Sequence, residues 1–67
     1  MSEELETAKR HLNQAKELRA IAAGTPSKEN RESLLKIAED YEGRARTMES
    51  IDKTKKAMRV WRIKTNH

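Results

Sequence analysis

Apolar residues recur at spacings of three and four over most of this chain, which is the period of an amphipathic helix. In the first third, these positions are Leu5, Ala8, Leu12, Ala15, Leu18 and Ala22. In the middle third, they are Leu34, Ile37, Ala38, Tyr41, Ala45 and Met48. The pattern predicts an all-α chain in which two helices pack through these apolar faces.

The segment Gly24-Thr25-Pro26 lies between the two patterns and predicts a tight turn. Gly24 fits the left-handed position that ends many helices. Thr25 fits the N-cap of the next helix, and Pro26 fits its first turn, where the missing N–H costs nothing. Ser2 fits the N-cap of the first helix, ahead of acidic residues that suit the helix dipole.

We therefore predict a single antiparallel hairpin, with a first helix over residues 2–23, a turn at 24–25 and a longer second helix over residues 26–63. Pairing about this turn places Met1 opposite Met48. About fifteen residues of the second helix, or ~22 Å, then extend beyond the first. The alanines at every seventh position of the first helix would let the second helix approach closely; they are Ala8, Ala15 and Ala22.

The composition indicates that this hairpin needs further support. The 67 residues are 39% charged and only 34% hydrophobic, without a phenylalanine, so the core has few large side chains. Such a small core does not offset the entropy lost on ordering the chain. The chain has no cysteine for a disulfide and no credible metal site. Oligomerisation remains, and we expect the hairpin to be completed as a helical bundle, for example a two-fold dimer with the long helices at its centre.

One face of the predicted extension is free of charge and is the expected oligomer interface. It consists of Gly43, Thr47, Ser50, Ile51, Thr54, Ala57, Met58 and Trp61. Trp61 is the expected anchor because aromatic residues dominate interface energetics. A glycine inside a helix costs roughly 1 kcal/mol. Either a close helix contact or simple variation at a surface position explains Gly43.

The charge is unevenly distributed. Residues 1–52 hold nine Lys/Arg and eleven Asp/Glu, a net charge of −2, whereas residues 53–67 hold six Lys/Arg and no acid, a net charge of +6. The six cations are Lys53, Lys55, Lys56, Arg59, Arg62 and Lys64. They are either a solubilising helix end that suits the dipole or a contact for a polyanion such as nucleic acid, with Trp61 stacking on a base.

The nucleic-acid alternative lacks a helix-turn-helix pattern, because two tightly joined helices leave no third element to brace a recognition helix. A further alternative is association of the same segment with a membrane surface through Met58, Val60, Trp61 and Ile63. No apolar run approaches the ~20 residues of a membrane span. The N-terminus is acidic where a signal peptide would be basic, and we expect a cytoplasmic protein.

We expect no enzymatic activity, no metal and no cofactor. His11 has no ligand or catalytic partner at neighbouring helical positions, which hold Thr7, Ala8, Gln14 and Ala15, so it fits the edge of the helix seam. The acidic residues are spaced as partners of Lys and Arg on exposed faces, as in Glu32–Lys36. A two-helix chain offers no concave pocket in which to perturb their pKa values.

The segment AKELRAIAAGTPSKENRESLLKIAEDYEGRA resembles a group of small, uncharacterised bacterial proteins built as helical hairpins. The shared features are a first helix with Leu18 and Arg19, a Thr-Pro turn, and the series Leu34-Leu35, Ala38, Glu39-Asp40, Tyr41 and Glu42. The similarity covers roughly residues 15–46. It implies the hairpin fold and carries no activity or functional residue with it.

Overall fold

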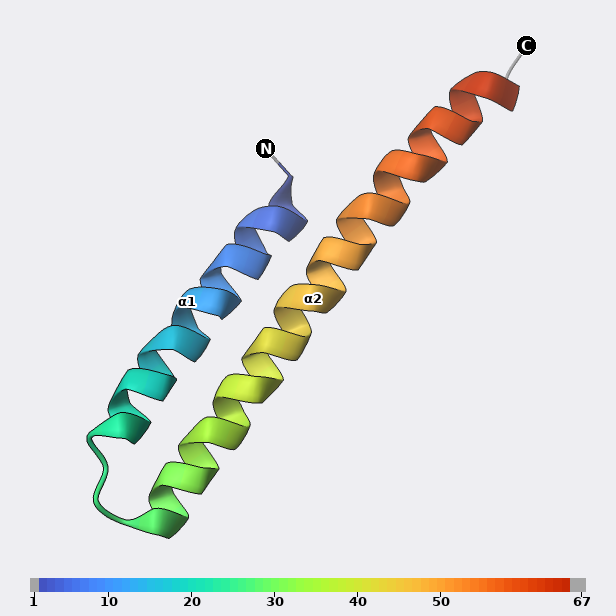
Figure 1. Ribbon diagram of the computed structural model, residues 1–67. Helices are drawn as coiled ribbons and strands as arrows, with labels where there is room; N and C mark the ends of the chain where they lie inside the picture. The colour runs from blue at the N-terminus through green and yellow to red at the C-terminus, as the bar shows by residue number, and fades with distance from the viewer. Residues whose placement is uncertain (1, 66–67) are drawn as a thin grey trace.

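The chain forms an antiparallel hairpin of two helices, α1 (Glu3–Ala23) and α2 (Lys28–Thr65), shown in Figure 1. This computed structural model describes the backbone of residues 2–65 and the side chains of residues 2–59. It confirms the all-α hairpin with a longer second helix. The molecule is a rod of 63 × 18 × 10 Å, and α2 continues well past the start of α1.

Ser2 caps α1 as its position predicts. Its backbone is extended, with φ −83° and ψ 145°, and its Oγ accepts a hydrogen bond from the N–H of Leu5 at 3.0 Å. Glu3, Glu4 and Glu6 follow in the first turn, where their charges favour the positive end of the helix dipole. The start of α1 is thus determined by local sequence.

The end of α1 differs from the prediction at Gly24. This residue has φ −94° and ψ 2°, so it is not left-handed. Its N–H donates to the carbonyl of Ile21 at 3.1 Å, which tightens the last turn of the helix without a positive φ. Thr25 belongs to the same end, since its Oγ1 donates to the Ile21 carbonyl at 2.7 Å. Thr25 therefore closes α1 and does not cap α2.

The second helix starts two residues later than predicted. Ser27 is its cap: the Ser27 Oγ accepts from the N–H of Asn30 at 3.4 Å, and the Ser27 carbonyl accepts from the N–H of Arg31 at 2.9 Å. Pro26 precedes the cap and is not the first helical residue. Ser27 supplies a capping hydroxyl where the chain can still turn, so the connection has four residues, 24–27, and not two.

The core consists of alanines. Five of them are at most 2% exposed: Ala8, Ala15, Ala22, Ala38 and Ala45. They recur every seventh residue on each helix, and we call them the alanine seam. Small side chains let two backbones approach closely, as predicted for the first helix. Among the described side chains, no larger one is fully buried.

The longer turn shifts the pairing of the helices. Met1 was expected opposite Met48, and the same pairing places Ser2 opposite residue 47 and Glu4 opposite residue 45. Instead Ser2 lies beside Asp52 and Glu4 pairs with Lys55, a shift of about two helical turns along α2. The four-residue turn runs on past the end of α1, so α2 begins beyond that end and the first residues of α2 have no part of α1 beside them (Figure 1). The part of α2 that extends beyond α1 is thereby shortened to about residues 57–65, which we call the overhang.

Candidate interaction surfaces

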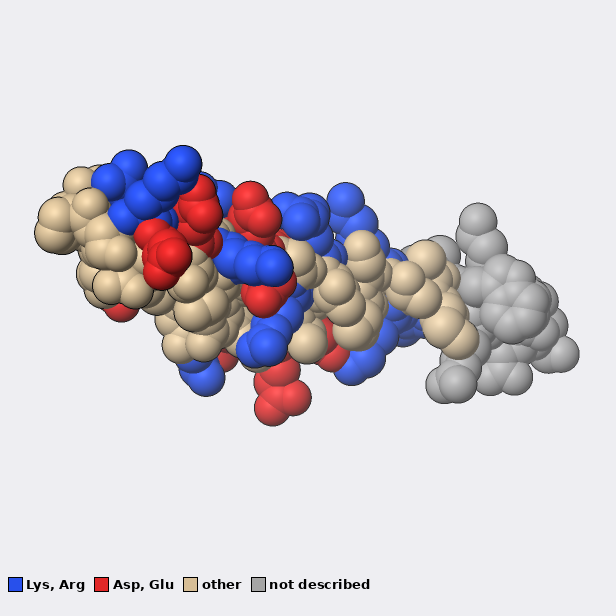
Figure 2. All heavy atoms as spheres, turned by 90° about the horizontal axis from the view of Figure 1, so that it is seen from below, with Lys and Arg blue, Asp and Glu red and all other residues tan. Residues whose placement is uncertain are grey.

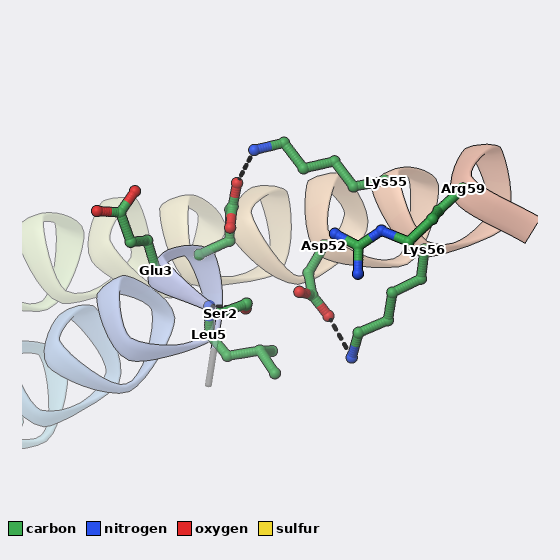
Figure 3. Close-up of a pocket in the computed structure, with 8 residues that line it drawn as sticks. Ser2, Glu3, Leu5, Asp52, Lys55, Lys56 and Arg59 are labelled. Carbon is green, nitrogen blue, oxygen red and sulfur yellow. Dashed lines mark hydrogen bonds and ion pairs between the residues drawn. The ribbon is translucent and has the colours of Figure 1, made fainter.

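Asp52 is the only charged residue among the described side chains that is buried, with 5% exposure. It lies seven residues after Ala45 and continues the alanine seam up to the start of α1. Figure 3 shows its carboxylate beside Ser2 and bonded to Lys56, whose Nζ is 3.0 Å away. A hydrogen bond with the side chain of Ser2, and then the one with Lys56, lower the pKa of Asp52. Asp52 thus ties the start of α1 to α2.

A second ion pair at the same place joins Lys55 to Glu4. The hydrogen bond with Lys55 lowers the pKa of Glu4, and the hydrogen bond with Glu4 raises the pKa of Lys55. Arg59 and Leu5 complete the lining of a half-open depression around these pairs. Because its charges already neutralise one another, the depression is a structural joint and not an open anion site.

The cations predicted to contact a polyanion are therefore only partly available for it. Lys55 and Lys56 are exposed, but each is paired with an acid of the same chain. Lys53 and Arg59 are exposed, and neither has an ion pair with another described residue. The side chains of Arg62 and Lys64 lie outside the described residues. Figure 2 shows basic and acidic groups interspersed along the visible face.

The predicted oligomer interface faces away from α1. Thr47, Ser50, Thr54 and Ala57 are exposed, and Gly43 is half-buried. A Cβ at Gly43 would meet only Nη2 of Arg46, at 3.8 Å, so no close contact with α1 explains this glycine. Ile51 and Met58, at the edge of the predicted surface, are 36% and 54% exposed. The side chain of Trp61 lies outside the described residues.

A second apolar surface, on the side of the hairpin, was not predicted. Ile37, Tyr41, Met48, Ile51 and Met58 lie along it on α2, and Leu18 and Ile21 lie beside them on α1. We call these residues the side stripe. Its most exposed members include Ile21 at 56% and Ile37 at 44%. Near the turn, four of them line an open depression together with Gln14 and Glu17.

The middle of the side stripe carries a stacked cluster. The rings of His11 and Tyr41 lie 5.5 Å apart, and the guanidinium of Arg44 lies 5.3 Å from the centre of the Tyr41 ring. Nδ1 of His11 is 3.3 Å from Oε1 of Gln14. His11 is half-exposed at the edge of the seam, as predicted. In the described part of the chain, no group of His, Cys, Asp and Glu side chains is arranged to hold a metal ion.

The opposite side of the hairpin is held by Arg19 and Glu42. Nη2 of Arg19 donates to one carboxylate oxygen at 2.7 Å and Nε donates to the other at 3.1 Å. This hydrogen bonding raises the pKa of Arg19 and lowers that of Glu42. The two-pronged geometry adds specificity to the register of the helices near the end of α1.

Comparisons with protein-family models, with curated proteins and with solved structures give no match to this chain. Within the described residues, neither helix has a stretch apolar enough to cross a membrane.

Proposed function

We propose that this protein is a non-enzymatic helical module that functions by associating with copies of itself. The observation that carries the proposal is the alanine seam. Burying five methyl groups removes little apolar surface from water, since each contributes about 0.8 kcal/mol. The large apolar residues that would stabilise a hairpin remain partly in contact with water, for example Leu12 at 43% exposure.

The total surface supports the same proposal. The chain exposes 5656 Å². A compact monomer of 7.8 kDa exposes only about 4,400 Å². The excess of about 1,300 Å² is larger than the ~800 Å² that each partner buries in a standard protein interface. Association of two copies would bring the exposed surface per chain close to that of an ordinary folded protein.

Sedimentation equilibrium across a hundredfold range of concentration, with circular dichroism on the same samples, tests the proposal. We expect a mass above that of one chain and a melting temperature that rises with concentration, because binding of folded copies stabilises the fold by mass action. A monomer that keeps its helicity and melts at one temperature at every concentration would contradict it.

A second candidate function is polyanion binding by the basic C-terminal segment, and the exposure of Lys53 and Arg59 favours it. The test is titration of duplex DNA at several salt concentrations, since phosphate contacts weaken steeply with salt. Lys53→Gln with Arg59→Gln should weaken binding. Lys9→Gln with Lys28→Gln removes the same charge from exposed sites elsewhere and is the matched control. Equal effects of the two pairs would show that the segment has no special role.

A further inference from the structure

We propose that the second copy docks on the side stripe, with its α2 antiparallel to α2 of the first copy. This inference rests on the proposed self-association and names its surface. It differs from the surface predicted from the sequence, which faces away from α1. Ile51 and Met58 belong to both surfaces, so the choice depends on the other residues of each.

The spacing along α2 supports this docking. Starting at Leu34, the positions on this side of the helix recur at strict intervals of three and four: Leu34, Ile37, Tyr41, Arg44, Met48, Ile51, Lys55 and Met58. This is the heptad repeat by which two helices pack in a coiled coil. Its shift relative to the α1-facing alanines leaves Ile37, Ile51 and Met58 exposed, so another helix can cover them. Six of the eight positions are apolar or aromatic.

The location of this repeat supports an antiparallel arrangement. The repeat runs from Leu34 to Met58, so its midpoint is residue 46. The helix α2 runs from Lys28 to Thr65, so its midpoint is residue 46.5. A two-fold axis there pairs the two long helices over their whole length. Tyr41 then lies beside Ile51 of the second copy, and Leu34 lies beside its Met58. No two charged residues of the repeat face each other.

The charges favour the antiparallel arrangement over a parallel one. Residues 28–42 contain three Lys/Arg and five Asp/Glu, a net charge of −2, whereas residues 53–64 have a net charge of +6. Antiparallel helices place the basic end of each copy against the acidic half of the other. Parallel helices would place the two basic ends together, and like charges in contact oppose association.

The antiparallel arrangement also gives the overhang a partner. With the axis at residue 46, residues 57–65 of one copy lie beside residues 27–35 of the other, next to its turn. The apolar depression lined by Leu18, Ile21, Ile37 and Tyr41 is close to this place, and Met58 of the second copy approaches it. The overhang of each copy therefore covers the exposed apolar residues near the turn of the other.

Cysteine crosslinking tests the arrangement, because the chain has no cysteine of its own. Met48→Cys lies two residues from the axis, so the two sulfurs are offset along the helices by only about 6 Å. A short bifunctional maleimide should convert most of this variant into covalent dimer. Arg44→Cys lies equally close to the two-fold axis, on its other side, and replaces an exposed residue. This variant is used for the crosslinking if Met48→Cys does not fold.

Two control variants make the result specific. Ser50→Cys is two residues from Met48, but it points to the opposite side of α2 and should crosslink at least ~10-fold less. Met58→Cys lies on the repeat, but an antiparallel pair separates it from its own copy by about 36 Å along the helices. It should not crosslink either.

The outcomes separate this inference from the proposed function. If the protein without crosslinker sediments as a monomer, the proposed self-association itself is wrong. If the protein is oligomeric but Ser50→Cys reacts in place of Met48→Cys and Arg44→Cys, copies meet through the outer surface. Efficient crosslinking of Met58→Cys would show parallel helices. The last two results overturn the inference while self-association stands.

Discussion

Replacement of Ala38 by leucine tests the alanine seam most directly. Ala38 has no exposed surface, and it belongs to the alanine seam through which α1 and α2 pack. Leucine adds three carbon atoms at a position where close approach of the two backbones leaves no room. Forcing extra carbons into a packed core costs about 1–3 kcal/mol.

The magnitude is measurable for a chain of this size. A change of 1 kcal/mol shifts the melting temperature of a small domain by about 4–8 °C, so Ala38→Leu should lower it by about 4–24 °C. Ala20→Leu is the matched control, because Ala20 is an exposed alanine in the last turn of α1. Leucine and alanine differ by only a few tenths of a kcal/mol in helix propensity.

Truncation gives a second measure of the same contact. Ala38→Gly loses a buried methyl group, worth about 0.8 kcal/mol, in addition to the ~1 kcal/mol by which glycine weakens any helix interior. Ala20→Gly should lose only the ~1 kcal/mol that glycine costs in a helix. All variants are compared by circular dichroism at one protein concentration, since association changes apparent stability. If Ala38→Leu melts at or above the temperature of Ala20→Leu, the helices are not closely packed at Ala38.

Three further predictions concern the ion pairs and the helix ends. The pKa values of Glu4, Glu42 and Asp52 are lowered, so the ion pairs of these carboxylates stabilise the fold. This stabilisation is complete above about pH 4, where the carboxyls of the unfolded chain are ionised, and it is lost as the pH falls through the lowered pKa values. The melting temperature should therefore fall below pH 4; a constant value down to pH 2 would show that these pairs contribute nothing. Gly24→Ala should leave the melting temperature unchanged or slightly higher, because alanine tolerates the observed φ and its Cβ would meet only the Ile21 carbonyl oxygen, at 3.8 Å; a clear decrease would indicate a positive φ. Ser27→Ala should cost about 1 kcal/mol in urea unfolding, and no loss would mean that Ser27 is not the cap of α2.

The fold follows from the sequence because its determinants are local. Apolar spacing at three and four residues predicted both helices, and Ser2 predicted the start of α1 correctly. The turn was less predictable, because Thr25 and Ser27 are both competent caps and the sequence alone does not choose between them. The turn also runs on past the end of α1, and this moved the register of the whole hairpin by about two helical turns.

The contacts between the helices depended on that register. The pair Lys56–Asp52 joins residues spaced i,i+4, so it depends on the helix alone and not on the register. The pairs of Lys55 with Glu4 and of Arg19 with Glu42 join residues far apart in the chain, so the error in register concealed them. The side stripe was missed for a related reason. The sequence assigns Ile37, Tyr41 and Met48 to the face that packs on α1, but the alanines occupy that contact and the larger residues lie beside it.

An alanine seam has a consequence for how this chain folds. Alanines at the contact bring the backbones close together, so the larger apolar residues flank the contact and remain half in water. Leucines at the same positions would have given the hairpin a core of its own. With alanines, much of the available apolar burial is left for a second molecule. If that molecule is another copy, the fraction of helix in dilute solution and the fraction of associated chains should rise together along one concentration curve. Helicity that reaches its full value at concentrations where sedimentation still shows single chains would separate folding from association.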